Sequence, residues 1–416
     1  MIATPPMKPA GLRELTPRSV ITGLAVAVVI GASYPYVVLK FGFGPNISVV
    51  SAFFGFLALG IFSRNYNRWE NNIVQTAGTT AGQIAFLCWL LAAFDMLASK
   101  PDSGFNVHLT TLQTFLWLST AGILGVLLAV PLRRHFIVDE KLPFPDGIAA
   151  AETLILLDSH GAQAGRSATA MVGALFAAGA LMFATSRAWI GEVLKISLNS
   201  FSAVTGFGFG ISLLNVGSGM IIGIRVTTSM LIGALLSWVI APVLLFNNGI
   251  IAESAHKSDI LLWVMWPATG LLVAGGLTAL ALKWRVLVKT FQSFSSSAID
   301  AGDFPMRWII SGSIASALAL VVIQAVFIGT PVWQSVVAIL LSLPLMLVAL
   351  RVLGETNWGP ISTMTNVMQA IFGALAPGDL RAGMVSSGIT GSVAAESEGL
   401  MQDYRPATSS VRPRGP

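Results

Sequence analysis

The chain has 416 residues, of which 54% are hydrophobic and only 10% are charged, against about 25% charged in an average soluble domain. A soluble protein of this size could not cover its surface with so few polar side chains. The net charge of +5 comes from Lys and Arg residues scattered between apolar segments, which is typical of membrane topology signals rather than of nucleic-acid binding.

Apolar runs of about 20 residues, long enough to cross a bilayer, recur along the chain. The first run is too long for a cleaved secretory signal. Two stretches near the C-terminus, at 360–376 and 382–395, contain Gly, Ser and Pro and predict one more span and one broken fragment. The uninterrupted runs predict spans at 19–41, 47–63, 72–99, 109–131, 168–190, 203–222, 226–247, 260–282, 307–329 and 331–353. The sequence therefore predicts an all-α polytopic membrane protein with about 10–12 transmembrane helices.

The distribution of basic residues predicts the orientation of these spans. If the N-terminus is cytoplasmic, most Lys and Arg residues fall in cytoplasmic loops, including those at 64–71 and 132–142, while the loops at 100–108 and 248–259 lie outside. This follows the positive-inside rule. The arrangement requires that residues 143–160 do not cross the membrane.

The segment at 143–160 is broken by Pro and carries Asp146, Glu152 and Asp158. Irregular backbone at membrane depth is tolerated only where protein or a water-filled cavity surrounds it. We expect a re-entrant or broken helix beside a pathway. A helix lying on the cytoplasmic surface is the alternative.

A weak internal repeat links two distant parts of the chain. The string SVV at 48–50, an apolar helix and RWENNIVQTAG at 68–78 resemble SVV at 335–337, an apolar helix and GETNWGPIST at 354–363. In each copy an acidic residue and an amide, Glu70 with Asn72 and Glu355 with Asn357, follow a span. Repeats of this kind build two-sided binding sites in many transporters.

Amides and hydroxyls crowd the beginning of the predicted span at 72–99. Gln75, Thr79 and Gln83 recur every four residues and share one helical face. Such groups can bind a neutral or zwitterionic ligand without the cost of a buried charge. The alternative is that they only join helix to helix by hydrogen bonds.

Carboxylates in apolar surroundings are candidates for binding and releasing a proton. The candidates are Glu70, Asp146, Glu152 and Glu355. The four His residues and the lone Cys88 show no metal-ligand spacing, and HExxH, CxxC, GxSxG and Walker-type motifs are absent from the sequence. The sequence thus indicates neither an enzyme nor a cofactor or metal site.

Several strings, in this order and spacing, resemble the oligopeptide transporter family in its prokaryotic branch. They are ENNIVQTAG, LPFPDGIAAAE at 142–152, GETNWGPIS with ALAPGDLRAG within 354–383, and LMQDY at 400–404. Each string alone is weak evidence, whereas together they cover the chain from about residue 17 to residue 404. The family includes the plant yellow-stripe transporters.

The resemblance implies a proton-coupled importer of short peptides or of metal chelates, built of roughly 16 spans by internal duplication. A transport-inactive membrane scaffold is the alternative from another class. Carried over to this sequence, the resemblance places the polar helix start and its repeat near the translocation path: Glu70, Asn71, Asn72, Gln75 and Thr76, with Glu355, Asn357, Ser362 and Thr363. Together with Thr79, which shares the helical face of Gln75, the amides and hydroxyls of this set form the predicted substrate site.

One departure from the family pattern concerns the end of the chain. After LMQDY the sequence runs into RPATSSVRPRGP and stops. We therefore expect a C-terminally truncated member that needs an oligomeric partner or a second chain to supply missing helices. The expected divisions are a cytoplasmic segment (1–18), a first repeat (19–330), a partial second repeat (331–404) and a polar disordered tail (405–416), in a multi-pass protein of the cell's inner (plasma) membrane.

Overall fold

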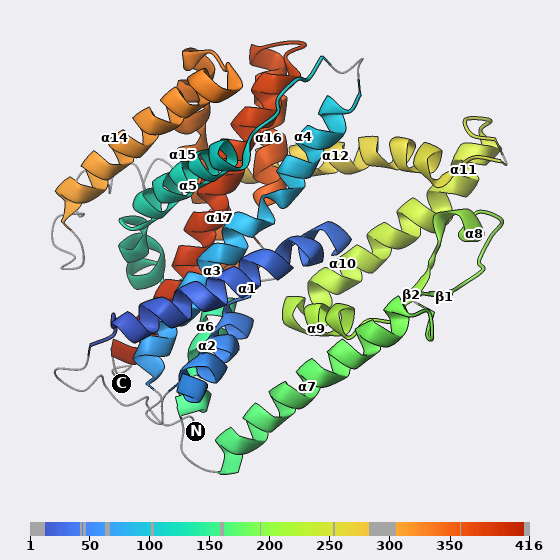
Figure 1. Cartoon of the computed structure of the whole chain (residues 1–416). Coiled ribbons are helices and arrows are strands. Elements are labelled where there is room, and N and C mark those ends of the chain that lie inside the picture. Colours follow the sequence, from blue (N-terminus) through green and yellow to red (C-terminus); the bar gives the residue numbers. More distant parts are fainter. Residues whose placement is uncertain are drawn as a thin grey trace. The chain divides into compact units, whose positions relative to one another are not determined.

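The computed structural model describes residues 13–41, 44, 47–62, 67–100, 104–158, 162–191, 193–252, 254–282, 305–357 and 359–411. The described residues fall into two compact units, one within 1–159 and 273–416 and the other within 160–272. Helices dominate both units (Figure 1).

The first unit carries the N-terminal and C-terminal helices of the chain. Its elements are α1 (Pro17–Phe41), α2 (Ser48–Phe62), α3 (Arg68–Phe86), α4 (Cys88–Ala98), α5 (Thr111–Ala129), the π-helix η2 (Arg134–Asp139), α6 (Pro145–Asp158), α14 (Met306–Ile323), the π-helix η4 (Gln324–Ile328), α15 (Val332–Thr356), α16 (Ile361–Leu375) and α17 (Leu380–Val411).

The second unit has a smaller core, in which Phe201, Ile251 and Ile260 are buried together. A short antiparallel hairpin pairs Val193 with Gly210. The elements of this unit are α7 (Ala162–Ser186), β1 (Val193–Lys195), α8 (Ser202–Thr205), β2 (Gly208–Gly210), α9 (Leu213–Ile222), α10 (Ile224–Leu235), the π-helix η3 (Leu236–Ile240), α11 (Ala241–Asn247) and most of α12 (Lys257–Leu282).

Local signals explain where several helices of the first unit begin and end. Asn67 caps α3 by accepting a hydrogen bond from the Trp69 backbone N–H at 3.0 Å. Thr110 and Gln113 form a reciprocal capping box at the start of α5. At the end of α15, Asn357 takes a left-handed conformation with φ of 62°. These are the residue types that satisfy the free N–H and C=O groups of helix ends.

Six helices among the described residues are long and apolar enough to cross a bilayer. They are Pro17–Lys40, Arg68–Ala98, Thr111–Ala129, Thr227–Asn247, Met306–Ile328 and Val332–Glu355. Several of their large apolar side chains are exposed, among them Val28, Phe115 and Val326. Lipid tails solvate such side chains as well as a protein core does. The prediction of an all-α polytopic membrane protein is confirmed, with one short hairpin as its only described β-structure.

The predicted span at 203–222 is wrong. Instead of one helix, this stretch forms α8, the strand β2 and α9. Gly206 ends α8 in a left-handed conformation with φ of 71°, and Gly208 lies so close to the Leu194 backbone that a side chain would clash with it. Glycine tolerates both conditions, so an apolar, glycine-rich run can leave the helix here.

Two other segments are more regular than the sequence suggests. Residues 145–158 form the unbroken helix α6, about 21 Å long at 1.5 Å per residue and shorter than the roughly 30 Å of a bilayer core. The stretch at 382–395, expected to be a broken fragment, lies inside the continuous 32-residue helix α17. This helix reaches Val411, within the range expected to be a disordered tail.

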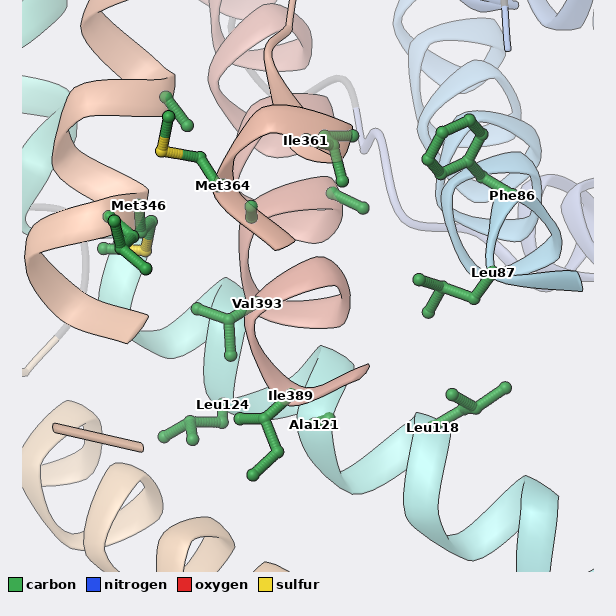
Figure 2. Close-up of a cluster of buried hydrophobic side chains, with 14 of the residues drawn as sticks. Phe86, Leu87, Leu118, Ala121, Leu124, Met346, Ile361, Met364, Ile389 and Val393 are labelled. Carbon is green, nitrogen blue, oxygen red and sulfur yellow. The ribbon is translucent and has the colours of Figure 1, made fainter. Parts of the chain in front are cut away.

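Helix α17 is the centre of the first unit, where it packs against α3, α5, α6, α15 and α16 (Figure 1). Apolar side chains fill the space around its middle. Figure 2 shows this cluster, with Ile389 and Val393 of α17, Leu118, Ala121 and Leu124 of α5, Met346 of α15, Ile361 and Met364 of α16, and Phe86 and Leu87 of the α3–α4 junction.

Small residues let α5 and α17 approach closely. A Cβ atom at Gly125 would lie 2.7 Å from the Val393 carbonyl oxygen and 2.9 Å from the Val393 Cα. The Ser397 hydroxyl donates to the Gly125 carbonyl at 2.9 Å. Close approach through glycine, reinforced by a hydroxyl, is a common way for membrane helices to associate.

Candidate functional site

The second half of α17 carries a buried polar segment, which we call the α17 acidic segment and define as Glu396, Glu398, Gln402 and Asp403. These residues are 3%, 4%, 2% and 5% exposed. None of them forms an ion pair with a Lys or Arg that the structure describes. Burying a carboxylate without a cationic partner is costly. Such groups inside a membrane protein therefore point to a functional site.

The polar face of α3 lies against this segment. The Gln75 amide donates to Asp403 Oδ1 at 2.6 Å and to Thr79 Oγ1 at 3.0 Å. The face predicted from the four-residue spacing thus lies in the protein interior, where a neutral donor holds a carboxylate.

Part of this face has a packing role. Ser51 of α2 donates to the Gln75 carbonyl at 2.8 Å, and the Asn71 amide donates to the Ala52 carbonyl at 2.9 Å. Hydrogen bonds of this kind join α2 to α3. In contrast, the side-chain oxygens of Gln75 and Asn72 are buried without a hydrogen-bond partner.

The two glutamates of the α17 acidic segment point to different neighbours. Glu396 packs its Cγ atom 3.2 Å from the position of a Cβ on Gly122 of α5. Glu398 packs against Gly359, and a Cβ at Gly359 would overlap its Oε2 atom and lie 2.7 Å from its Cδ. Gly359 belongs to the non-helical break between α15 and α16, so this break borders the acidic segment.

The same break holds the N-terminus of α6. The Asn357 amide donates to Asp146 Oδ1 at 2.7 Å, and the Asp146 backbone N–H donates to Asn357 Oδ1 at 2.9 Å. Burial raises the pKa of the Asp146 carboxyl, and the hydrogen bond from Asn357 opposes that rise. We call this reciprocal pair the Asp146–Asn357 clasp. It joins two candidate residues 211 positions apart.

Three other predicted carboxylates lie in different surroundings. Glu70 forms an ion pair with Arg18 and accepts a hydrogen bond from Thr16 at 2.6 Å, which ties the chain before α1 to α3. Glu355 pairs with Arg351 one turn earlier on α15, with atoms 2.9 Å apart. The Glu152 side chain is exposed on α6. Of the predicted hydroxyls on α16, Ser362 is exposed and Thr363 is half-buried.

Glu396, Glu398 and Asp403 are not among the site residues predicted from the sequence, although LMQDY contributed to the family resemblance. A signal was present. The string AAESEGLMQDY directly follows an apolar stretch, and three carboxylates continuing a helix of small and apolar residues are unusual inside a membrane protein. The predicted broken fragment ended at residue 395, so it left these carboxylates outside the helix that carries them.

Comparison with known families agrees with this architecture. The sequence profile of the OPT oligopeptide transporter protein family matches residues 14–405. The chain belongs to this family. Members of the OPT family are membrane transporters, not enzymes, and the resemblance found in the sequence is confirmed.

Individual relatives from bacteria, fungi and plants show the same relationship. Two bear the name "putative oligopeptide transporter": one from Haemophilus influenzae, 30% identical over 61% of this chain and 38% of its own length, and one from Saccharomyces cerevisiae, 24% identical over 96% of this chain and 74% of its own length. The iron-phytosiderophore transporter yellow stripe 1 of Zea mays is 28% identical over 57% of this chain and 40% of its own length. The match thus spans about two-fifths of the Haemophilus and maize proteins.

Proposed function

We propose that this OPT family protein takes part in proton-coupled uptake of short peptides or amino-acid-derived metal chelates across the inner (plasma) membrane. The observation that carries the proposal is the α17 acidic segment, which is buried in the centre of the first unit and faces a helix lined with amides and hydroxyls. A scaffold without transport activity would gain nothing from carboxylates buried without a described cation, since they destabilise the fold.

The substrate path, in this proposal, runs between α17, the polar face of α3 and the break between α15 and α16. Amides and hydroxyls there can bind the peptide groups of a substrate as both donors and acceptors. Non-helical backbone in a membrane protein is tolerated where it lines a cavity, which supports a path along the break at Asn357 and Gly359. The other proposed contacts are Asn71, Asn72, Thr76, Thr79, Ser362 and Thr363.

The coupling proton is proposed to bind at Asp403, with Glu396 as the neighbouring carboxylate two helical turns away. Asp403 accepts a hydrogen bond from the neutral Gln75 amide, a donor that suits a carboxyl group in its charged and in its neutral form. The next residue on α17, Tyr404, has the Arg133 guanidinium over its ring. Asp146 is a second candidate because it is buried and its side-chain partner, the Asn357 amide, is also neutral.

The proposed orientation places the N-terminus in the cytoplasm. Single cysteines at Lys100 and Lys141, both exposed, would report it in a Cys88→Ala background, since Cys88 is the only cysteine of the chain. Labelling by a membrane-impermeant maleimide from outside the cell should reach position 100 and not position 141. The reverse pattern contradicts the orientation.

Uptake by vesicles that contain the purified chain tests the function. A labelled short alanine peptide and a labelled iron–phytosiderophore chelate would be offered with and without an inward proton gradient. The proposal predicts that at least one solute accumulates only with the gradient. It further predicts that Asp403→Asn abolishes the stimulation by the gradient. Absence of uptake of both solutes would favour the scaffold.

A further inference from the structure

Glu398 and Gln402 form a group of hydrogen-bond acceptors without a described donor. They are spaced i, i+4 on α17 and so lie one above the other on the same face of the helix. Both side chains are more than nine-tenths buried. Glu398 Oε1 and Gln402 Oε1 have no hydrogen-bond partner. Leaving a buried carboxylate oxygen or a buried amide oxygen without a hydrogen bond costs free energy.

The break between α15 and α16 leaves room for the Glu398 carboxylate. The break between α15 and α16 begins with Asn357 in a left-handed conformation and places Gly359 directly against Glu398. Any side chain at position 359 would occupy the space of the carboxylate. The contact therefore depends on glycine at a point where the backbone has left the helix.

No described Lys or Arg forms an ion pair with Glu398, and two arginines of this part of the unit have other partners. Arg351, on the helix that leads into the break, pairs with Glu140 and Glu355. Arg133 lies over the Tyr404 ring. A cation for Glu398 is thus expected to come from a ligand.

The chemistry of the acceptors narrows the class of that ligand. A primary ammonium group has three donors and no acceptor, which matches an ionised carboxylate next to an amide oxygen. A divalent metal ion needs more oxygen or nitrogen ligands than this pair supplies, and among the described residues no three His, Cys, Asp or Glu side chains come together.

We infer that Glu398 and Gln402, bordered by Gly359, form the subsite that binds the primary ammonium group of the transported molecule. This inference rests on the proposed function, because it assigns the substrate's cationic group to the same path. It narrows the substrates to molecules with a free amine, such as peptides with an unblocked N-terminus or chelators that keep an amino group.

The first test needs no knowledge of the natural substrate. The thermal unfolding of the purified chain would be followed in butylammonium chloride and in sodium chloride, each at roughly 50 mM, because a ligand that binds only the folded state raises the unfolding temperature. The inference predicts a higher unfolding temperature in butylammonium for the unaltered chain. It predicts no difference between the two salts for Glu398→Gln and for Gly359→Ala.

A matched control is Asp95→Asn, which removes an exposed carboxylate on α4 of the same unit. This variant should keep the full response to butylammonium. An equal response in both salts, or a butylammonium effect that survives in Glu398→Gln, would overturn the inference. Because each variant is compared with itself in two salts, a general loss of stability cannot imitate the predicted result.

The second test links the subsite to transport. A short alanine peptide should compete with labelled solute about tenfold better or more than its N-acetylated form, since acetylation removes the charged donor of a hydrogen bond to Glu398. In Glu398→Gln the two forms should compete equally. The subsite is contradicted if the unaltered chain does not prefer the free peptide over its N-acetylated form, or if Glu398→Gln keeps the same preference. Butylammonium binding without any uptake would leave the subsite standing and reject the proposed function.

Discussion

The contact between α5 and α17 at Gly125 can be tested by adding a single methyl group. In Gly125→Ala, the new Cβ would lie 2.7 Å from the Val393 carbonyl oxygen and 2.9 Å from the Val393 Cα. Ordinary contact distances are about 3.5–4.0 Å, so the two backbones must move apart by about 1 Å. Overpacking of this kind costs about 1–3 kcal/mol. The gain in helix propensity from Ala, about 0.5–1 kcal/mol, does not offset it.

The expected result is a lower thermal unfolding temperature for Gly125→Ala, measured by intrinsic fluorescence of the purified chain in detergent. The matched control is Gly31→Ala in α1, where an added Cβ meets nothing within 4 Å. Because the control gains propensity without a clash, its unfolding temperature should stay the same or rise. Separation of the helices would also weaken the Ser397 bond to Gly125 and displace the α17 acidic segment, so uptake should fall. An unchanged or higher unfolding temperature for Gly125→Ala would refute the packing described here.

Substitutions at three further positions test other parts of the first unit. Asn357→Gly loses the hydrogen bonds to Asp146 but tolerates the left-handed backbone. Asn357→Ala loses the same bonds and also strains the backbone, so it should be about 1 kcal/mol less stable than Asn357→Gly. Equal unfolding temperatures of the two variants would contradict this. Arg18→Ala leaves Glu70 without its ion-pair partner and should reduce the amount of protein in the membrane, while uptake per molecule stays near normal; a selective loss of uptake would place Glu70 in the transport path instead. Gln75→Ala removes a hydrogen-bond donor to Asp403, and leaving a buried acceptor without its donor costs about 1–3 kcal/mol of free energy. Uptake should fall about tenfold while the abundance of the protein stays normal. Equal losses of abundance and uptake would indicate a packing role.

Much of the fold follows from the lengths of the apolar runs. The predicted spans at 19–41, 109–131 and 331–353 correspond to α1, α5 and α15 within a few residues. A long uninterrupted apolar run forms a helix in these cases, because a helix satisfies its own backbone hydrogen bonds inside the membrane.

Local pattern could not decide where glycine and polar residues interrupt such runs. At 203–222 the glycines allow a hairpin, whereas near 395 similar small residues allow α17 to continue in close contact with its neighbours. The difference depends on tertiary partners. The short backbone contact of Gly208 with Leu194 favours the hairpin, and the tight fit of α17 against Gly125 favours the helix.

The candidate site shows the same division between local and long-range information. The four-residue spacing of Gln75 and Thr79 predicted a shared polar face, since helix geometry alone determines it. No local pattern could reveal that the Gln75 amide donates to Asp403, 328 residues later. Asp146 and Asn357 were each singled out by sequence, but their reciprocal hydrogen bonds depend on how α6 docks against the end of α15.

Proton movement at Asp403 is the central claim, and a pH-sensitive dye sealed inside vesicles that contain the purified chain measures it most directly. Adding a short peptide with a free amino terminus from outside should acidify the interior of vesicles with the unaltered chain, because each cycle carries a proton inward with the substrate. In Asp403→Asn this acidification should be abolished while the protein remains folded and correctly inserted. Acidification of equal rate in Asp403→Asn would contradict the assignment of the coupling proton to the α17 acidic segment.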